Sequence, residues 1–294
     1  MTINERDLRI SASKPALSVR GTVARKRELG GRRPSRAWRI REDIPARWRA
    51  ALMVASIALP LAAWVLLRAT NTVQELFLPG PLDVLRAGKE LALSGDLGAD
   101  TLASVQRIAL GFGLALLISV PLGLAIGTFK SVNAFFEPLI AFLRYMPATA
   151  FVPLLLIWLG LGEGPKVGLI VIGTVFFNTL MIANIVWSVP SELIRVSQTL
   201  GGGTFTVFRK VIFPFALPGM IDAARVNLAA AWNLIVVAEL VAADQGLGFR
   251  IVRAQKFLHT DQIFAILIVI GLLGLTSDLG LRALRNRVAP WSQE

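Results

Sequence analysis

The polar side chains that lie inside long apolar stretches are the residues of this sequence whose chemistry most needs an explanation. A polar or charged group is costly inside a lipid bilayer, which makes it a candidate for the lining of a transport pathway. Amide, indole and guanidinium groups also donate hydrogen bonds, which suits the passage of a small oxyanion or organic anion. The residues that we predict for such a pathway are Arg144, Asn178, Asn184, Trp232, Asn233 and Glu239.

Glu239 and Arg144 carry opposite charges, and a charge inside a membrane needs water or a partner. One interpretation joins the two residues in a structural ion pair. The other places both of them near a gate of the pathway. The sequence gives no distance between them, so both interpretations stay open.

No arrangement of residues predicts an enzyme. The chain has no cysteine, and its single histidine, His259, falls in a predicted loop, where a solvated side chain is the simpler interpretation. The glycine run at 201–203 continues into Thr204 without the lysine of a phosphate-binding loop. We therefore predict no catalytic residue, no metal site and no cofactor bound by this chain.

The composition indicates which elements must position these residues. A hydrophobic share of 54% with only 17% charged residues is more apolar than a soluble fold requires. The apolar residues come in blocks near the roughly 20 residues that cross a bilayer. The sequence predicts an all-α, polytopic transmembrane helical bundle of about six transmembrane helices, with spans over 50–67, 108–129, 135–159, 167–187, 226–243 and 262–281.

The distribution of charge predicts the topology. Much of the formal net charge of +12 comes from arginines in the first fifty residues, and positive segments flanking membrane spans stay in the cytoplasm. We expect residues 1–45 to be a basic, mostly disordered cytoplasmic tail and residues 46–72 to hold the first transmembrane helix, which is not a cleaved signal. An even number of crossings returns the C-terminus to the cytoplasm. Aromatic platforms for nucleic acid are lacking in the tail, so we expect no nucleic acid partner.

One predicted external loop does not follow this charge rule. Between the fifth and sixth spans the chain carries Arg250, Arg253 and Lys256 against only Asp244 and Asp261. The predicted topology leaves these cations unexplained.

Glycines and prolines predict where helices pack closely or break. Gly123 and Gly127 have the spacing that brings two membrane helices together. Pro147 and Pro153 fall in one span and predict a broken helix beside a cavity. The turn-forming residues before Leu82 predict a short amphipathic helix over 82–93 on the outer surface.

The loop over 188–221 has the most informative spacing. Permeases of ABC importers share a cytoplasmic loop of the form Glu-Ala-Ala, three residues, Gly, nine residues and Ile-x-Leu-Pro, and this chain resembles it: Gly201 and the run Val211 to Pro214 are in register. Arg195, Val196 and Ser197 replace Glu-Ala-Ala, so a cation stands where the family has a carboxylate.

Other segments resemble the sulfonate, taurine, nitrate and bicarbonate branch of the same family. These are the run from Arg144 to Gly162, Ala238-Glu239-Leu240 followed by Gly246 to Phe249, and the segment from Leu279 to Trp291. The resemblance covers roughly residues 75–292.

The resemblance implies the type I ABC importer permease fold over residues 73–290, in the bacterial inner membrane with both termini cytoplasmic. It implies a homodimer with a second copy of the permease, two ABC ATP-binding subunits that bind ATP and Mg²⁺, and an extracytoplasmic substrate-binding protein, periplasmic or lipid-anchored. The substrate would be a small anion of the sulfonate, taurine, nitrate or bicarbonate type. Coupling to the ATPase would use Arg195, Val196, Ser197, Gln198, Thr199, Leu200, Gly201, Gly202 and Pro214.

Two other classes of function stay open at this point. An ion-coupled secondary transporter predicts an inverted repeat and acidic residues near the membrane centre, where only Glu239 and the more terminal Asp278 are candidates. A non-transporting membrane anchor would act through its basic tail, and removal of residues 1–45 would abolish its activity.

Overall fold

The computed structural model describes residues 44–70 and 72–292. The chain divides into two compact units, residues 1–58 and 59–294, and each is described by itself. Of the first unit, the structure describes the start of helix α1 (Ala46–Ala69), whose side chains there are mostly exposed. The predicted tail over residues 1–45 lies almost wholly outside the described residues and stays a prediction.

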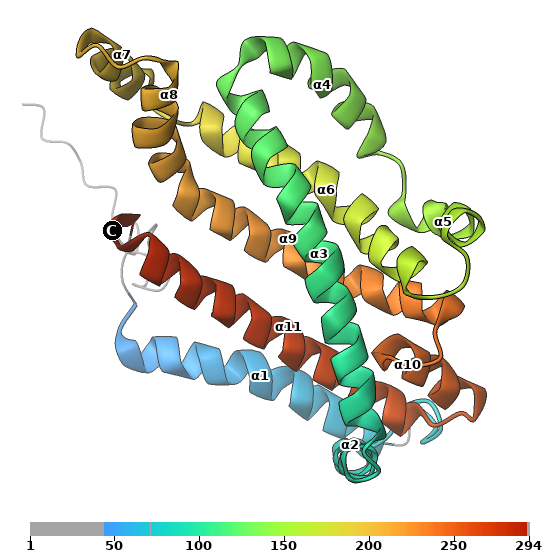
Figure 1. Ribbon diagram of the computed structural model, residues 1–294. Helices are drawn as coiled ribbons and strands as arrows, with labels where there is room; N and C mark the ends of the chain where they lie inside the picture. Colours follow the sequence, from blue (N-terminus) through green and yellow to red (C-terminus); the bar gives the residue numbers. More distant parts are fainter. Residues whose placement is uncertain (1–43, 71, 293–294) are drawn as a thin grey trace, which may run out of the picture. The chain divides into compact units, whose positions relative to one another are not determined.

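All regular elements of the described residues are helical, as predicted (Figure 1). Five helices are long and apolar enough to cross a membrane, and a bent pair makes up to six. After α1 the elements are α2 (Pro81–Leu93), α3 (Asp96–Thr128), α4 (Lys130–Leu143), η2 (Ala148–Phe151), α5 (Val152–Leu159), α6 (Glu163–Trp187), α7 (Ser191–Thr199), α8 (Thr204–Val207), η3 (Phe208–Ile212), α9 (Phe213–Ala242), α10 (Leu247–Lys256), α11 (Thr260–Val288) and η4 (Pro290–Ser292).

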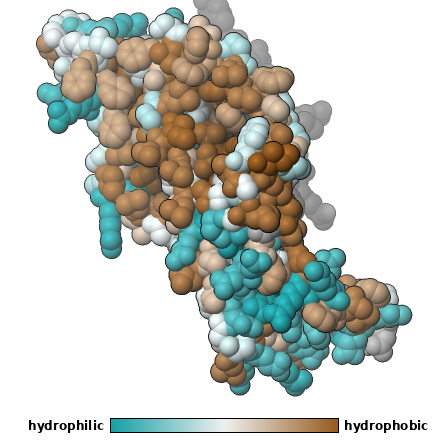
Figure 2. Space-filling model, turned by 45° about the vertical axis from the view of Figure 1, so that its right-hand side comes forward, coloured by the Kyte–Doolittle hydropathy of each residue, from teal (hydrophilic) through white to brown (hydrophobic). Residues whose placement is uncertain are grey.

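The surface of these helices is apolar, which is expected of chains that face lipid. Figure 2 shows a broad hydrophobic area with hydrophilic residues gathered at one end. Large apolar side chains such as Leu117, Phe135 and Ile157 are more than 70% exposed. Such a surface would be an aggregation liability in water and is suited to a bilayer.

The third predicted span is broken, as its prolines predicted. Helix α4 and the segment over 148–159 meet at 83°. Pro147 has an extended backbone before η2, and Pro153 lies in the first turn of α5, the position where a missing N–H is tolerated. The break therefore follows from the local sequence.

Helices α3 and α6 pack closely through glycines. A Cβ atom added at Gly123 would lie 2.8 Å from the Cβ of Ile182, and one at Gly127 would lie 2.5 Å from the Cβ of Val186. Contacts this short leave no space for a methyl group. The predicted close packing at these two glycines is confirmed.

The fifth span begins earlier than predicted. Elements α8, η3 and α9 form one helical run over 204–241, whereas the apolar block begins near residue 226. Pro214 does not end a helix but lies in the first turn of α9. The turn before it is a π-helix, in which the N–H of Phe213 donates to the carbonyl of Phe208, so the chain passes through the proline region without ending the helix.

Helix α2 forms over nearly the residues that were predicted. It begins at Pro81 and buries Val84, Ala87 and Leu91. Gly95, with φ of 79°, reverses the chain between α2 and α3. Helix α2 packs against α11 and α3.

Candidate functional site

The predicted coupling loop is a short helix with a well-defined end. Helix α7 is closed by Gly201, whose φ of 82° is left-handed. The N–H of Gly201 donates to the carbonyl of Gln198, and the N–H of Gly202 donates to the carbonyl of Ser197, both at 2.9 Å. This pair of bonds is a Schellman motif, which a glycine at this position favours.

Helix α7 presents apolar side chains without burying any of its residues. Val196 is 57% exposed and Leu200 is 82% exposed. Beside them lies a groove of about 590 Å³, which also involves Lys210, Pro214 and Trp291. Five of the nine predicted coupling residues line this mostly apolar groove: Val196, Ser197, Leu200, Gly202 and Pro214.

The cation that replaces the family carboxylate has a partner within the same helix. Arg195 Nη2 donates to Glu192 Oε1 at 2.8 Å, and both side chains are about 70% exposed. A carboxylate is therefore present in this helix, but at Glu192, about one turn before the position at which the motif has its glutamate.

The predicted pathway residues do not meet at one place. Asn184 and Asn233 are exposed on α6 and α9, and Asn233 donates to the backbone carbonyl of Ala229. Asn178 and Trp232 are buried, and neither the Asn178 amide nor the Trp232 indole N–H has a hydrogen-bond partner among the described residues.

Glu239 is almost completely buried and forms an ion pair, but not with Arg144. Arg107 Nη1 donates to Glu239 Oε1 at 2.7 Å, Ser104 Oγ donates to the same oxygen at 2.7 Å, and the Gly248 N–H donates to Oε2 at 2.8 Å. The interpretation of Glu239 as a structural ion-pair residue is supported, and the predicted partner was wrong.

Arg107 links three segments that are distant in sequence. Besides Glu239 on α9, it binds Glu163 at the start of α6, with Nη2 to Oε1 at 2.8 Å, and the backbone carbonyl of Gln245 at 2.7 Å. Lys166 Nζ also donates to Glu163 Oε1, at 2.9 Å. Arg107 and Lys166 are both buried, while Glu163 is exposed.

The position of Arg250 explains part of the excess of cations in the loop before the last span. Its Nε donates to Asp100 Oδ2 at 2.6 Å and its Nη1 to Asp96 Oδ2 at 2.9 Å, so the cation is buried against carboxylates of α3. Burial lowers the pKa of Arg250, but the hydrogen bonds and charges of Asp100 and Asp96 raise it above its ordinary value. Arg250 therefore stays charged and holds α10 against α3.

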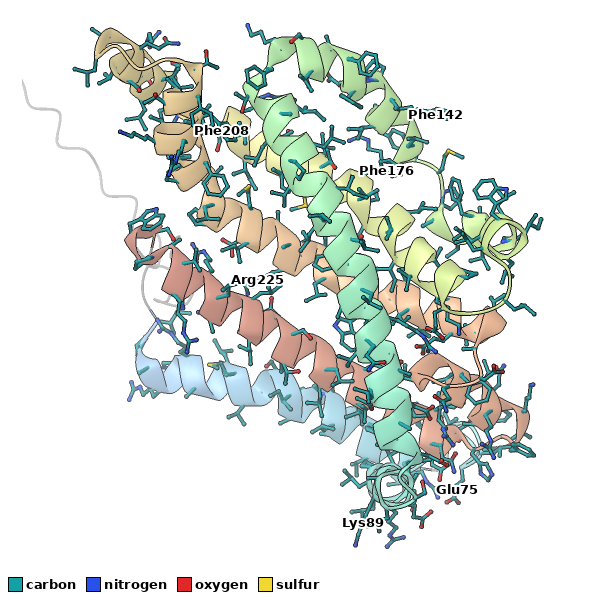
Figure 3. All side chains as sticks on the ribbon, in the orientation of Figure 1. Glu75, Lys89, Phe142, Phe176, Phe208 and Arg225 are labelled. Atoms are coloured by element: carbon teal, nitrogen blue, oxygen red, sulfur yellow. The ribbon has the colours of Figure 1, made fainter. Side chains whose placement is uncertain are left out.

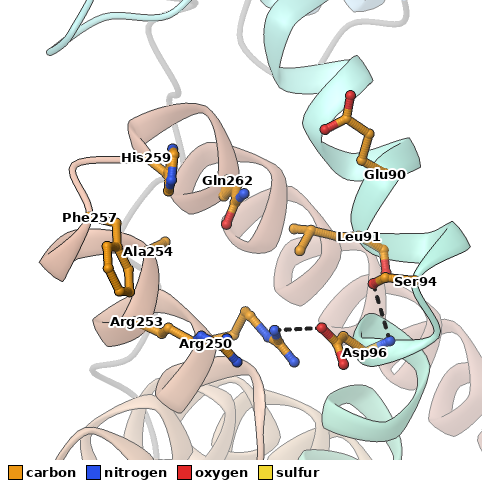
Figure 4. Close-up of a pocket in the computed structure, with 10 residues that line it drawn as sticks. All are labelled: Glu90, Leu91, Ser94, Asp96, Arg250, Arg253, Ala254, Phe257, His259 and Gln262. Carbon is orange, nitrogen blue, oxygen red and sulfur yellow. Dashed lines mark hydrogen bonds and ion pairs between the residues drawn. The ribbon is translucent and has the colours of Figure 1, made fainter.

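Beside Arg250 there is an open polar cavity of about 450 Å³ between α2, α10 and the start of α11. Figure 4 shows Arg250 bonded to Asp96 at its edge, with Arg253 and His259 on the α10 and α11 side. We refer to the bonded residues at this end of the second unit as the polar cluster: Asp96, Asp100, Ser104, Arg107, Glu163, Lys166, Glu239 and Arg250.

The sequence reasoning missed the α3 members of the polar cluster. Asp100, Ser104 and Arg107 follow one another at spacings of four and three residues, which places them on one face of a helix. This polar helical face could have been recognised from the spacing. It was missed because it precedes residue 108, where the second predicted span begins, whereas α3 itself begins at Asp96.

Arg144 lies at the end of α4, apart from the polar cluster. Its Nη2 donates to the hydroxyl of Tyr145 at 3.1 Å, and its guanidinium lies 4.9 Å from the centre of that ring. Its Nε is buried without a hydrogen-bond partner in the described part of the chain.

A second set of ion pairs joins α9 to α11. Arg225 donates twice to Asp278, each time at 2.9 Å, and Arg285 lies 3.1 Å from Asp222. These side chains are 24–41% exposed, in contrast to Asp100, Arg107 and Glu239 of the polar cluster, which are buried. Figure 3 shows Arg225 on α9. Over the described ranges, no group of three or more histidine, cysteine or acidic side chains is arranged to hold a metal.

The chain is similar to proteins of one family. Residues 119–290 match the family of binding-protein-dependent transport system inner membrane components. A probable ABC transporter permease of Brucella abortus is 36% identical over 82% of this chain and 96% of its own length. The taurine transport system permease of Escherichia coli is 36% identical over 85% of this chain and 93% of its own length.

Among solved structures, the methionine ABC transporter in an inward-facing conformation has a similar fold. Its TM-score is 0.58 at 18% identity, and the likeness covers 67% of this chain and 98% of that one. At this identity the likeness concerns the fold alone.

Proposed function

Because this chain belongs to the family of binding-protein-dependent transport system inner membrane components, we propose that it passes a small anion through a pathway formed by two copies of itself. It is the membrane-spanning permease subunit of an ABC importer. It is not an enzyme, since ATP hydrolysis lies in the partner subunits.

The observation that carries the coupling role is the α7 surface. A short helix closed by Gly201 exposes Val196 and Leu200 beside a groove, which suits docking into a cleft of an ATP-binding subunit. Helix α8 follows α7 after four residues, and the π turn η3 continues α8 into α9. A displacement of α7 by the partner would therefore act on a membrane span. ATP and Mg²⁺ would be bound by two such partners.

For the topology, we place α7 in the cytoplasm and the polar cluster on the outer side, facing an extracytoplasmic binding protein. In Figure 1, α7 and α10 lie at opposite ends of the second unit. Burial of Arg250 reduces the number of outward-facing cations that contradict this orientation. Both termini are then cytoplasmic.

The substrate we propose is a small anion of the sulfonate, taurine, nitrate or bicarbonate type. The taurine permease of Escherichia coli is among its relatives. Half-buried Arg144 and the buried donors Asn178 and Trp232 are consistent with such a substrate. Asn184, Asn233 and Glu239 stay predictions for the pathway, of which Glu239 has the most evident structural role.

The test is to reconstitute the chain with its ATP-binding subunits and binding protein, and to compare Gly201→Val with Gly201→Asn. A β-branched residue in a left-handed conformation costs roughly 1–2 kcal/mol, whereas asparagine tolerates it. We expect Gly201→Val to lower uptake by about tenfold at an unchanged membrane level, while Gly201→Asn retains most uptake.

Uptake by Gly201→Val at the level of the unsubstituted chain would contradict the coupling role of α7. A chain that purifies without ATP-binding subunits and still transports would contradict the homodimeric importer. The mass of the purified complex measures the number of copies of each subunit.

A further inference from the structure

A small pocket between α4 and α6 brings charges of both signs together. It has a volume of about 70 Å³. Its lining includes Asn133, Glu137 and Arg144 from α4 and Trp187 from α6. In Figure 3, Phe142 marks α4 and Phe176 marks α6.

The polar lining comes from one face of α4. Asn133, Glu137 and Arg144 follow at spacings of four and seven residues, which is one stripe along an α-helix. Glu137 and Arg144 are therefore about 10.5 Å apart along the helix axis, measured between their backbones. Their side chains can approach each other from the two ends of the pocket.

Neither charged side chain has an ion-pair partner within the described residues. Asn133 Nδ2 donates to Glu137 Oε2 at 2.8 Å, and the Glu137 side chain is exposed. Arg144 Nη2 donates to the hydroxyl of Tyr145, and its guanidinium lies over the same ring. No ion pair joins Glu137 to Arg144 in the described structure, and Arg144 Nε and Asn133 Oδ1 are buried without hydrogen-bond partners there. Buried polar atoms normally have hydrogen-bond partners, so a ligand in the pocket is a suitable partner for these two atoms.

A molecule that carries opposite charges at its two ends would satisfy both groups. We propose that the pocket between α4 and α6 is a transit site for a small zwitterion, with an oxyanion head on Arg144 and an ammonium group on Glu137. The guanidinium offers planar donors that suit a sulfonate or carboxylate. The Glu137 carboxylate accepts from the ammonium, and Asn133 supplies a further acceptor.

This inference rests on the proposed function and narrows it from a small anion to an amino sulfonate or a related zwitterion. A simple anion would give Glu137 no cationic partner and would be repelled by the negative charge of its carboxylate. The pocket therefore discriminates between two classes of substrate that share one anionic head.

The experiment uses the absence of cysteine from the natural sequence. Ala141→Cys places a single thiol in the pocket lining, and Ala92→Cys places one on the exposed side of α2 as a control. The rate of maleimide labelling is measured in the purified complex without binding protein, in the presence of taurine or of ethanesulfonate, which lacks the ammonium group.

We expect taurine to slow the labelling at position 141 saturably and to leave position 92 unaffected. Glu137→Gln should raise the taurine concentration for half protection by about tenfold, the size expected for one hydrogen bond to a charged group, without affecting ethanesulfonate. Arg144→Gln should weaken protection by both compounds. Glu90→Gln and Arg86→Gln, which make the same changes on α2, should affect neither.

Equal protection by taurine and ethanesulfonate in Ala141→Cys overturns the assignment without any further substitution. So does an unchanged response in a folded Glu137→Gln variant. ATP hydrolysis stimulated by taurine-loaded binding protein is measured in the same preparation. Stimulation without protection at position 141 contradicts the pocket and leaves the importer function intact.

Discussion

The polar cluster and the α7 surface lie at opposite ends of the second unit and are built in opposite ways (Figure 1). The polar cluster joins α3, α6, α9 and α10 through charges most of which are buried, including Glu239 with only 1% of its surface exposed. Helix α7 buries none of its nine residues.

The difference indicates where the molecule is held rigid and where it can respond. Buried, bonded charges open only at a high cost in free energy, whereas a helix with few buried contacts can shift at little cost. We infer that one end fixes the relative positions of the spans and the other receives the force of a partner. Four substitutions, two of them paired with a second variant for comparison, test this difference from the largest expected effect to the smallest.

Arg107→Met should have the largest effect. It leaves Glu239 buried without its cation, and removal of one partner of a buried pair costs roughly 3–5 kcal/mol. The measurement is thermal unfolding of the purified chain in mild detergent. Arg195→Met, on exposed α7, is the matched control and should change the free energy of unfolding by less than about 1 kcal/mol. Equal loss in the two variants would remove the distinction between the two ends.

Glu239→Gln should follow, with a loss of roughly 1.5–3 kcal/mol, because a charged acceptor of several buried hydrogen bonds becomes neutral. Glu163→Gln affects the same arginine, but the Glu163 side chain is 60% exposed, so its loss should be about 1 kcal/mol or less. Unfolding curves of the two variants under identical conditions give the comparison. A larger loss in Glu163→Gln would mean that the exposed half of the polar cluster carries its stability.

Asp278→Asn should give an intermediate result. It weakens the two hydrogen bonds from Arg225 that tie α9 to α11, in side chains that are part-exposed. In the same unfolding measurement, we expect a loss smaller than that of Glu239→Gln and larger than that of Glu192→Gln. A loss as large as that of Glu239→Gln would show that the α9–α11 pairs are as important as the buried ones.

Glu192→Gln should have the smallest effect on stability. Its pair with Arg195 is exposed and lies within one helix, where such pairs contribute about 0.3–0.5 kcal/mol. The unfolding temperature should therefore remain within error of the unsubstituted chain. A clear decrease would indicate that α7 is more firmly anchored than its exposure suggests.

Local features of the sequence were sufficient for much of the fold. The spans follow from apolar length, and the break near Pro147 follows from a ring that removes an N–H donor. The end of α7 follows from Gly201, because a left-handed residue favours glycine. The boundaries were less accurate: α3 and the 204–241 run extend beyond their apolar blocks, since polar residues that find partners can continue a helix.

The candidate site was predicted less completely than the fold. The coupling residues over 195–202 lie together because they are neighbours in the chain, and Pro214 lines the same groove as four of them. The pathway residues do not, because their spacing along separate helices says nothing of which faces meet. Asn184 and Asn233 are exposed, whereas Asn178 and Trp232 are buried.

By itself the sequence determined the class of this protein, its membrane spans, its helix breaks and the loop that identifies its family, because each depends on residues close together in the chain. Only the tertiary structure decided the partners of its charges. Arg107 and Glu239 are 132 residues apart, and Arg250 and Asp100 are 150 apart. Such pairs form because a buried charge must find an opposite one, and which one it finds depends on how the helices pack.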